Sequence, residues 1–116
     1  NASSLPPLPQ GISATWNRSI PTRCVRLLNM VPPEKVDEEL ERELLDECNK
    51  FDKVETVTIF EDEVDRDIVV KIFILFTTIE GAQKAQSTLD KRFFDGNQII
   101  ADFYNEDYFR QGEYRL

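Results

Sequence analysis

The chain has 116 residues, of which 41% are hydrophobic and 31% are charged, and its formal net charge is −8. It contains no histidine, so histidine-based acid–base catalysis and imidazole metal sites are excluded. Proteins that bind nucleic acids use Lys and Arg to neutralise phosphates, so an acidic domain is a poor generic nucleic-acid binder and favours a basic partner.

No set of residues in the sequence supports catalysis, a metal site or a cofactor site, and we expect the chain not to be an enzyme. No apolar run approaches the roughly 20 residues that span a bilayer, so we expect no membrane association. Residues 1–21 contain Leu5-Pro6-Pro7-Leu8-Pro9 and no regular hydrophobic period, which predicts an N-terminal extension or linker. Residues 22–116 are predicted to form one folded domain.

The first half of the domain alternates between strand and helix patterns. Residues 24–28 predict a strand, and a loop with two prolines follows. Residues 34–50 predict a helix, because apolar residues recur on one face at Val36, Leu40, Leu44 and Cys48. Residues 54–60 are β-branched and alternate in polarity, which predicts a second strand.

The second half begins with a charged turn (61–67), an apolar strand (68–76) and a helix with a small-residue face (80–89). A turn (93–97), a last strand (98–104) and a short helix capped by Asn105 follow. The order β-α-β-β-α-β predicts an α+β, ferredoxin-like fold, the plan of RNA recognition motifs. It has a four-stranded antiparallel sheet with two helices on one face, to which this chain adds a C-terminal helix.

RNA recognition motifs stack bases on aromatic residues of their two central strands. In this sequence Arg26 and Lys71 stand where two of those aromatic residues are expected, and only Phe73 remains. These three residues predict at most a residual RNA face. Alternation places Phe73 on the open face of the sheet, where Tyr108 and Phe109 of the C-terminal helix could cover it.

The residues around two other segments carry a family resemblance. Eight acidic and two basic residues lie between Glu34 and Glu47, a local charge of −6, and Arg92-Phe93-Phe94 follows the second predicted helix. With Leu28-Asn29-Met30-Val31 and the stretch 103–110, this order resembles the UHM family, the U2 auxiliary factor homology motif. The resemblance covers about residues 22–110 and is strongest to splicing factors that carry an upstream G-patch.

The resemblance implies that the domain is a nuclear protein–protein interaction module of pre-mRNA splicing. Its partner would be a peptide of another splicing factor, with basic residues followed by a tryptophan. By position, Phe94 would stack on the ligand indole, and Arg92 would form an ion pair with Glu47. Asp37 and Glu43 would receive the basic residues of the peptide. Glu43 and Glu47 are four residues apart and should share one helix face.

Two details of this motif are open at the level of sequence. Phe93 is the alternative pocket aromatic, because adjacent residues there point in opposite directions, and one of Phe93 and Phe94 should be in the core. Family members usually have Gly before the Arg, where this chain has Lys91. If that position has a positive φ, Lys91 carries a conformational cost; otherwise the turn differs.

Three further hypotheses remain. Trp16-Asn17 resembles the core of a UHM ligand, so Trp16 could occupy the pocket of its own molecule or of a neighbour, which would make a homodimer. The simpler interpretation is that Trp16 packs on the surface of its own domain. A weak RNA-binding domain is an alternative function, as is a DNA-repair role, because some plant and parasite relatives carry that label.

Overall fold

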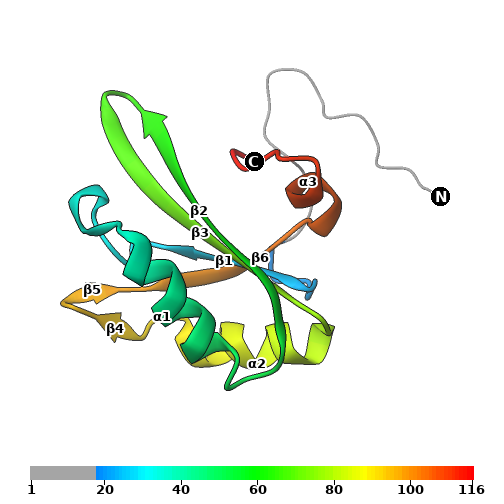
Figure 1. Ribbon diagram of the computed structural model, residues 1–116. Helices are drawn as coiled ribbons and strands as arrows, with labels where there is room; N and C mark the ends of the chain where they lie inside the picture. Colours follow the sequence, from blue (N-terminus) through cyan, green and yellow to red (C-terminus); the bar gives the residue numbers. More distant parts are fainter. Residues whose placement is uncertain (1–17) are drawn as a thin grey trace.

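The central sheet of the computed structural model has four antiparallel strands in the order β2-β3-β1-β6 (Figure 1). Their bounds are Cys24–Leu28 for β1, Val54–Val64 for β2, Asp67–Phe76 for β3 and Ile100–Tyr104 for β6. The structure describes residues 18–116, so Trp16 and most of the predicted linker lie outside the described residues.

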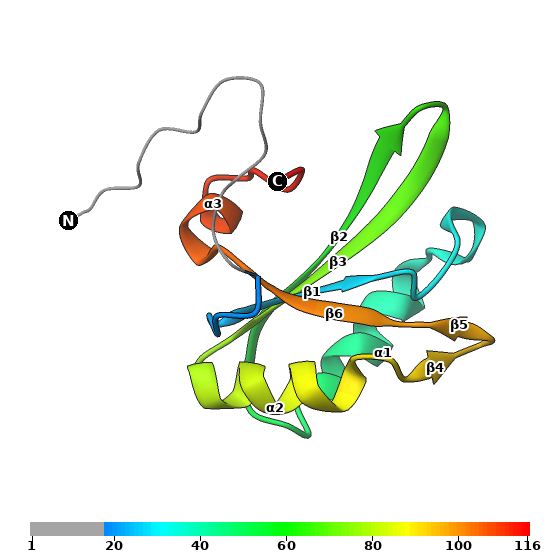
Figure 2. The same ribbon diagram turned by 180° about the vertical axis from the view of Figure 1, so that it is seen from behind.

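Two helices, α1 (Glu38–Cys48) and α2 (Ile79–Leu89), cover one face of the sheet, and α3 (Glu106–Arg110) lies at the opposite face (Figures 1 and 2). This arrangement confirms the predicted ferredoxin-like fold with its additional C-terminal helix. The predicted cap of α3 is also confirmed, because Oδ1 of Asn105 accepts a hydrogen bond of 3.0 Å from the backbone N–H of Tyr108. Among residues 18–116, no helix is long and apolar enough to cross a membrane.

The first helix begins later than its hydrophobic pattern predicted. Residues Pro33–Lys35 form a short 3-10 turn, η1, and Val36 is extended. The α-helix starts after Asp37, whose Oδ1 accepts a hydrogen bond of 2.9 Å from the backbone N–H of Leu40. The predicted start at residue 34 was wrong, because an Asp that caps a helix has extended backbone angles and cannot lie inside it.

The hairpin between β2 and β3 is longer than predicted. The predicted turn at 61–67 is almost entirely strand, and only Asp65 and Arg66 form the turn, with φ of 49° and 73°. Two consecutive positive φ values match the twist of a tight hairpin, which lets both strands continue to the tip. Charged residues are accommodated there because the hairpin projects past the rest of the sheet into solvent (Figure 1).

The predicted last strand, 98–104, is divided in two. Strands β4 (Phe93–Phe94) and β5 (Asn97–Gln98) form a separate small hairpin, and β6 begins only at Ile100. Asp95 and Gly96 make the turn of this β4–β5 hairpin with φ of 52° and 86°. Asp-Gly at a two-residue turn is typical of tight hairpins, and that signal was present in the sequence.

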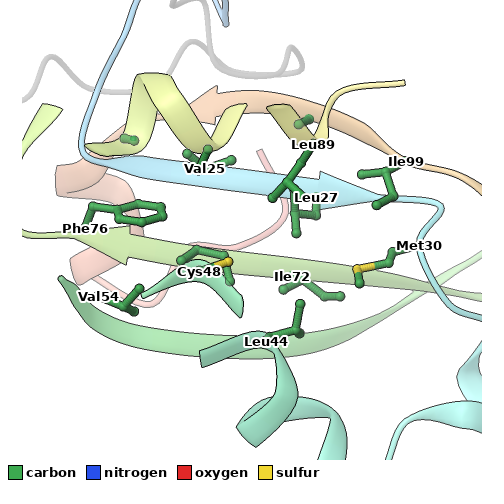
Figure 3. Packing of buried hydrophobic residues seen from close by; sticks show 14 of the residues in the cluster. Val25, Leu27, Met30, Leu44, Cys48, Val54, Ile72, Phe76, Leu89 and Ile99 are labelled. Atoms are coloured by element: carbon green, nitrogen blue, oxygen red, sulfur yellow. The ribbon is translucent and has the colours of Figure 1, made fainter. Parts of the chain in front are cut away.

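The hydrophobic core lies between the sheet and the two larger helices (Figure 3). It contains Ile72, Ile74 and Phe76 of β3, as the alternation predicted, with Ala82 and Ala85 from α2. A second cluster lies on the other face of the sheet and is made by Cys24, Phe73, Leu75, Tyr104, Tyr108 and Phe109. The prediction that the C-terminal helix covers Phe73 is therefore confirmed.

Both cysteines are buried and free. Cys24 lies in the cluster beneath α3, and Cys48 lies in the main core. Burial raises the pKa of both thiols, that of Cys48 to about 12. Neither thiol is therefore activated as a nucleophile.

Candidate functional site

A pocket of about 530 Å³ lies between α1 and the β4–β5 hairpin. Its rim combines acidic residues of the helix with residues of the hairpin segment: Glu43, Asp46, Glu47, Arg92, Phe93 and Phe94. Its floor is apolar and is made by Leu27, Met30, Leu40, Leu44, Cys48, Leu89 and Ile99. An apolar cavity of this size with a few polar groups at its rim is the usual form of a binding site.

Helix α1 supplies one wall of the pocket because its two faces differ. Leu40 and Leu44 are buried and reach the pocket floor, while Glu43 and Glu47 stand at the rim. The prediction that Glu43 and Glu47 share one helix face is confirmed. Asp37 does not line the pocket: it is exposed at the N-terminus of α1, where it caps the helix.

The hairpin segment is held in place through Lys91, whose φ is 69°. The backbone N–H of Lys91 donates to the carbonyl of Ile99 at 2.7 Å, and the N–H of Ile99 donates to the carbonyl of Arg92 at 2.7 Å. Of the two possibilities that the sequence left open, the first holds: a non-glycine residue occupies a left-handed position. That conformation costs a residue with a Cβ about 1–2 kcal/mol.

Phe93 and Phe94 both line the pocket, and neither belongs to the core. Phe93 is 66% exposed and Phe94 is 38% exposed. The expectation that one of them would be buried in the core was wrong. The reason is that β4 belongs to a two-stranded hairpin outside the main sheet, so both of its faces are open.

The predicted ion pair between Arg92 and Glu47 is not present among the described residues. Both side chains line the pocket, but Oε1 of Glu47 pairs instead with Nζ of Lys50 at 3.1 Å. Lys50 is three residues away along the chain, in the turn that follows α1. The Arg92 guanidinium therefore stands at the pocket rim without a carboxylate of α1 bound to it.

Three contacts clamp the β4–β5 hairpin to the loop that joins β1 to α1. Lys35 forms an ion pair with Asp95 at the hairpin turn. Nδ2 of Asn29 donates to the carbonyl of the last residue of β5 at 2.9 Å, and Nδ2 of Asn97 donates to the carbonyl of Met30 at 3.3 Å. Sequence reasoning missed these residues, because no pattern in the sequence shows that the two segments lie side by side.

The three residues predicted as a residual RNA face are all engaged inside the domain. Phe73 is fully buried, and its ring packs on those of Tyr104, Phe109 and Tyr114 at centroid distances of 4.8, 5.6 and 5.3 Å. Arg26 is buried and its Nη2 lies 2.6 Å from Oδ2 of Asp102. Lys71 pairs with the buried Asp62 at 2.9 Å.

The segment that covers this face is fastened at several points. The Tyr104 hydroxyl donates to the carbonyl of Glu113 at 2.6 Å and accepts from the N–H of Leu116 at 3.0 Å. Burial raises the pKa of Tyr104 to about 12. Glu106 accepts hydrogen bonds from Arg23 and Arg110, which lower the pKa of its carboxyl group. The central positions of the open face are therefore closed to a stacking base.

The family model of the RNA recognition motif matches residues 35–100, more than half of the chain. The chain belongs to this family. RNA recognition motifs are binding domains, which supports the prediction that this domain is not an enzyme. The match covers strands β2 and β3 and all of the residues that line the pocket except Leu27 and Met30.

Two splicing factors are similar in sequence to this chain. The poly(U)-binding-splicing factor hfp of Drosophila melanogaster is 40% identical over 103 residues, covering 83% of this chain and 16% of that protein. Human splicing factor 45 is 45% identical over 91 residues, covering 78% of this chain and 23% of that protein. The chain thus spans less than a quarter of either relative. These similarities are consistent with the predicted resemblance to splicing factors.

Solved RNA recognition motifs share the fold. The RNA recognition motif of RNA15 superposes with a TM-score of 0.57 at 23% identity, covering 75% of this chain and 95% of that one. The Rna15 motif with bound RNA (GU) gives a TM-score of 0.56 at 16% identity, covering 81% of this chain and all of that one. At these identities the similarity establishes the fold alone.

Proposed function

We propose that this RNA recognition motif is a UHM-type interaction module of pre-mRNA splicing. It would bind a peptide of another splicing factor, in which basic residues precede a tryptophan, in the pocket between α1 and the β4–β5 hairpin. The observation that carries the proposal is the combination of an open aromatic and acidic pocket with a covered sheet face. Splicing takes place in the nucleus, which would then be the location of the protein.

The pocket offers an indole an apolar floor and aromatic rings at its rim. An aromatic side chain that becomes buried covers about 150–250 Å², which corresponds to roughly 4–6 kcal/mol of gross stabilisation. Phe94 is only partly exposed, so it would form a wall against which the indole stacks, while Phe93 would shield it from water. Ordering a flexible peptide offsets part of this gain, and an affinity near micromolar, about −8 kcal/mol, is expected.

The acidic wall would receive the basic residues that precede the tryptophan. Glu43, Asp46 and Glu47 stand at the pocket rim, and Asp37 marks the N-terminal end of the same helix. A ligand that runs along α1 would therefore meet carboxylates over the whole helix length. Arg92 would be free to contact a carboxylate or a carbonyl of the peptide.

RNA binding is the second candidate function. It is favoured by the name of the Drosophila relative, a poly(U)-binding splicing factor. The burial of Phe73 and the net charge of −8 disfavour it for this domain. No feature of the described residues favours a role in DNA repair.

Calorimetric titration separates the two candidates. A peptide with Lys and Arg residues followed by Trp is compared with the same peptide carrying Ala in place of Trp, and with a pyrimidine-rich RNA of similar length. We expect binding near micromolar for the tryptophan peptide, and at least about 30-fold weaker binding for the Ala control. Tighter binding of the RNA, with a steep dependence on salt, would overturn the proposal.

A further inference from the structure

The β2–β3 hairpin leaves part of β3 without a neighbour on one side. Strand β3 pairs with β1 only from Lys71 to Leu75, whereas its pairing with β2 continues to Asp67. The chain turns away after β1 because Asn29 has a φ of 62°. Residues 67–70 therefore form a strand edge that no described strand covers.

The register shows which main-chain groups point to this edge. The N–H of Phe76 donates to the carbonyl of Arg23 on the β1 side at 2.8 Å. Main-chain groups alternate in direction along an antiparallel strand, so the even-numbered residues of β3 face that side. Ile68 and Val70 thus present N–H and C=O groups to the open edge, which is a template for another strand.

A groove of about 450 Å³ lies between this edge and the loop after β1. Its lining is mostly apolar and includes Leu28, Pro33, Ile68, Val69 and Ile100. Ile68, Val69 and Ile100 all line this groove and are 44%, 36% and 50% exposed, so the groove offers apolar surface to water. Such a surface is typical of an interaction site.

The acidic charge near the groove favours a basic ligand. Residues 61–67 of the hairpin contain five acidic residues and one basic residue, a local charge of −4. Within residues 18–116, Asp62 is the one acidic residue of this stretch that forms ion pairs, with Lys71 and Arg115. A second copy of this acidic chain would be repelled, and so would the phosphates of a nucleic acid, which would also find no aromatic ring in the groove.

We propose that this groove binds an extended segment of a partner protein that alternates apolar and basic residues. The segment would add as a strand to the free edge of β3. Its apolar side chains would cover Val69 and Ile100, and its Lys or Arg side chains would meet the acidic hairpin. This surface is separate from the pocket beside Phe94, because the β4–β5 hairpin and the loop after β1 stand between them.

The probe is a synthetic peptide that alternates Lys and Val. It has about eight residues, which is within the usual length of a strand. Its controls are a peptide alternating Glu and Val, and the Lys-Val peptide with two central prolines, which cannot pair as a strand. Each is titrated into the isotope-labelled domain and followed by amide NMR shifts. We expect saturable shifts at Ile68 and Val70 with the Lys-Val peptide alone.

Substitutions at the groove give the second arm of the experiment. Ile68→Lys and Ile100→Lys should each weaken the Lys-Val peptide at least about tenfold, since they remove apolar contact and add a like charge. Ile79→Lys changes an equally exposed isoleucine on α2 and should have no effect. Phe94→Ala should also have none, which separates this site from the tryptophan pocket.

Two outcomes with the Lys-Val peptide would overturn the proposal: no amide shifts at saturating concentration, or shifts confined to the acidic face of α1. Equal binding of the proline peptide, or shifts of Ile68 and Val70 caused by a pyrimidine-rich RNA, would also overturn it. Self-association of the domain in sedimentation, abolished by Ile100→Lys, would make a second copy the occupant and would equally contradict it. Circular dichroism of each variant establishes that the fold is retained.

Discussion

At the scale of single residues, Phe94 and Phe93 allow the sharpest test of the pocket. Phe94 is the less exposed of the two and lines the pocket, so under the proposed function it would stack on the ligand indole. We expect Phe94→Ala to weaken the tryptophan peptide by about 2 kcal/mol, roughly 30-fold, while the domain stays folded. Phe93→Ala should cost less, because its ring is mostly in water. Unchanged affinity of the Phe94 variant by calorimetry would remove this residue from the site.

Lys91 carries a backbone conformation that suits glycine. Its φ of 69° costs about 1–2 kcal/mol, whereas glycine at this position loses about 0.5–1 kcal/mol of additional chain entropy on folding. Lys91→Gly should therefore raise the free energy of unfolding by about 0.5 kcal/mol. Lys91→Ala is the matched control, because it keeps the Cβ and hence the cost. Equal urea midpoints for the two variants would contradict this account.

At the scale of elements, the clamp between the β4–β5 hairpin and the loop after β1 is expected to position the pocket wall. Asn97→Ala removes the hydrogen bond to the carbonyl of Met30. We expect about a fivefold loss of affinity for the tryptophan peptide, about 1 kcal/mol, with little change in stability. The control is Gln86→Ala, which removes a similar bond to the carbonyl of Ala101 between two residues that do not line the pocket.

The Gln86 variant should lower stability and leave peptide affinity unchanged. If both variants affect the peptide equally, the hairpin is not positioned by its clamp. The distinction is measurable because the two hydrogen bonds have the same chemistry, a side-chain amide that donates to a backbone carbonyl, and differ only in location.

Helix α3 is held by charge, so its attachment should depend on pH. Hydrogen bonds from Arg23 and Arg110 lower the pKa of Glu106 below its usual value of 4.5. A lowered pKa in the folded state contributes stability that is complete above the unfolded value and is lost as the pH falls through the folded value. Glu106→Gln should therefore lower the free energy of unfolding by about 1 kcal/mol at neutral pH, where water screens the pair only partly.

The same substitution should have little effect at a pH below the lowered pKa of Glu106, where the wild-type carboxyl group is also protonated. Urea unfolding of both proteins at neutral and acidic pH measures the difference. A destabilisation that stays constant across this range would show that Glu106 acts through packing and not through its charge.

At the scale of the whole molecule, the net charge of −8 should make peptide binding sensitive to salt. Raising the salt concentration from about 0.1 M to about 1 M shortens the Debye length from about 10 Å to about 3 Å. We expect affinity for the basic tryptophan peptide to fall about tenfold, and Glu43→Lys to cost more than Glu43→Ala. A peptide that keeps the Trp but lacks basic residues should show neither effect. Salt-independent binding of the basic peptide would mean that the acidic face of α1 is only solvated surface.

Local patterns in the sequence were sufficient for most of the fold. The alternation in β3 separated Ile72 and Ile74 from Phe73, because successive side chains of a strand point to opposite faces. Asn105 predicted the cap of α3, because its short side chain reaches the free N–H groups of a first helical turn. The spacing of Glu43 and Glu47 placed both on one face of α1. Each of these properties depends only on neighbours along the chain.

Other features became visible only in the folded chain. Asp37 caps α1 through its bond to Leu40 and does not line the pocket, so its proposed contact with the peptide stays a prediction. Glu47 bound Lys50 in place of Arg92, and Phe93 and Phe94 both stayed exposed because their hairpin left the main sheet. The family resemblance predicted that α1 and the Arg92 segment form one site. The floor of the pocket and the clamp of the β4–β5 hairpin became visible only in the folded structure. Local periodicity fixes which face a side chain is on, and only tertiary packing decides what that face meets.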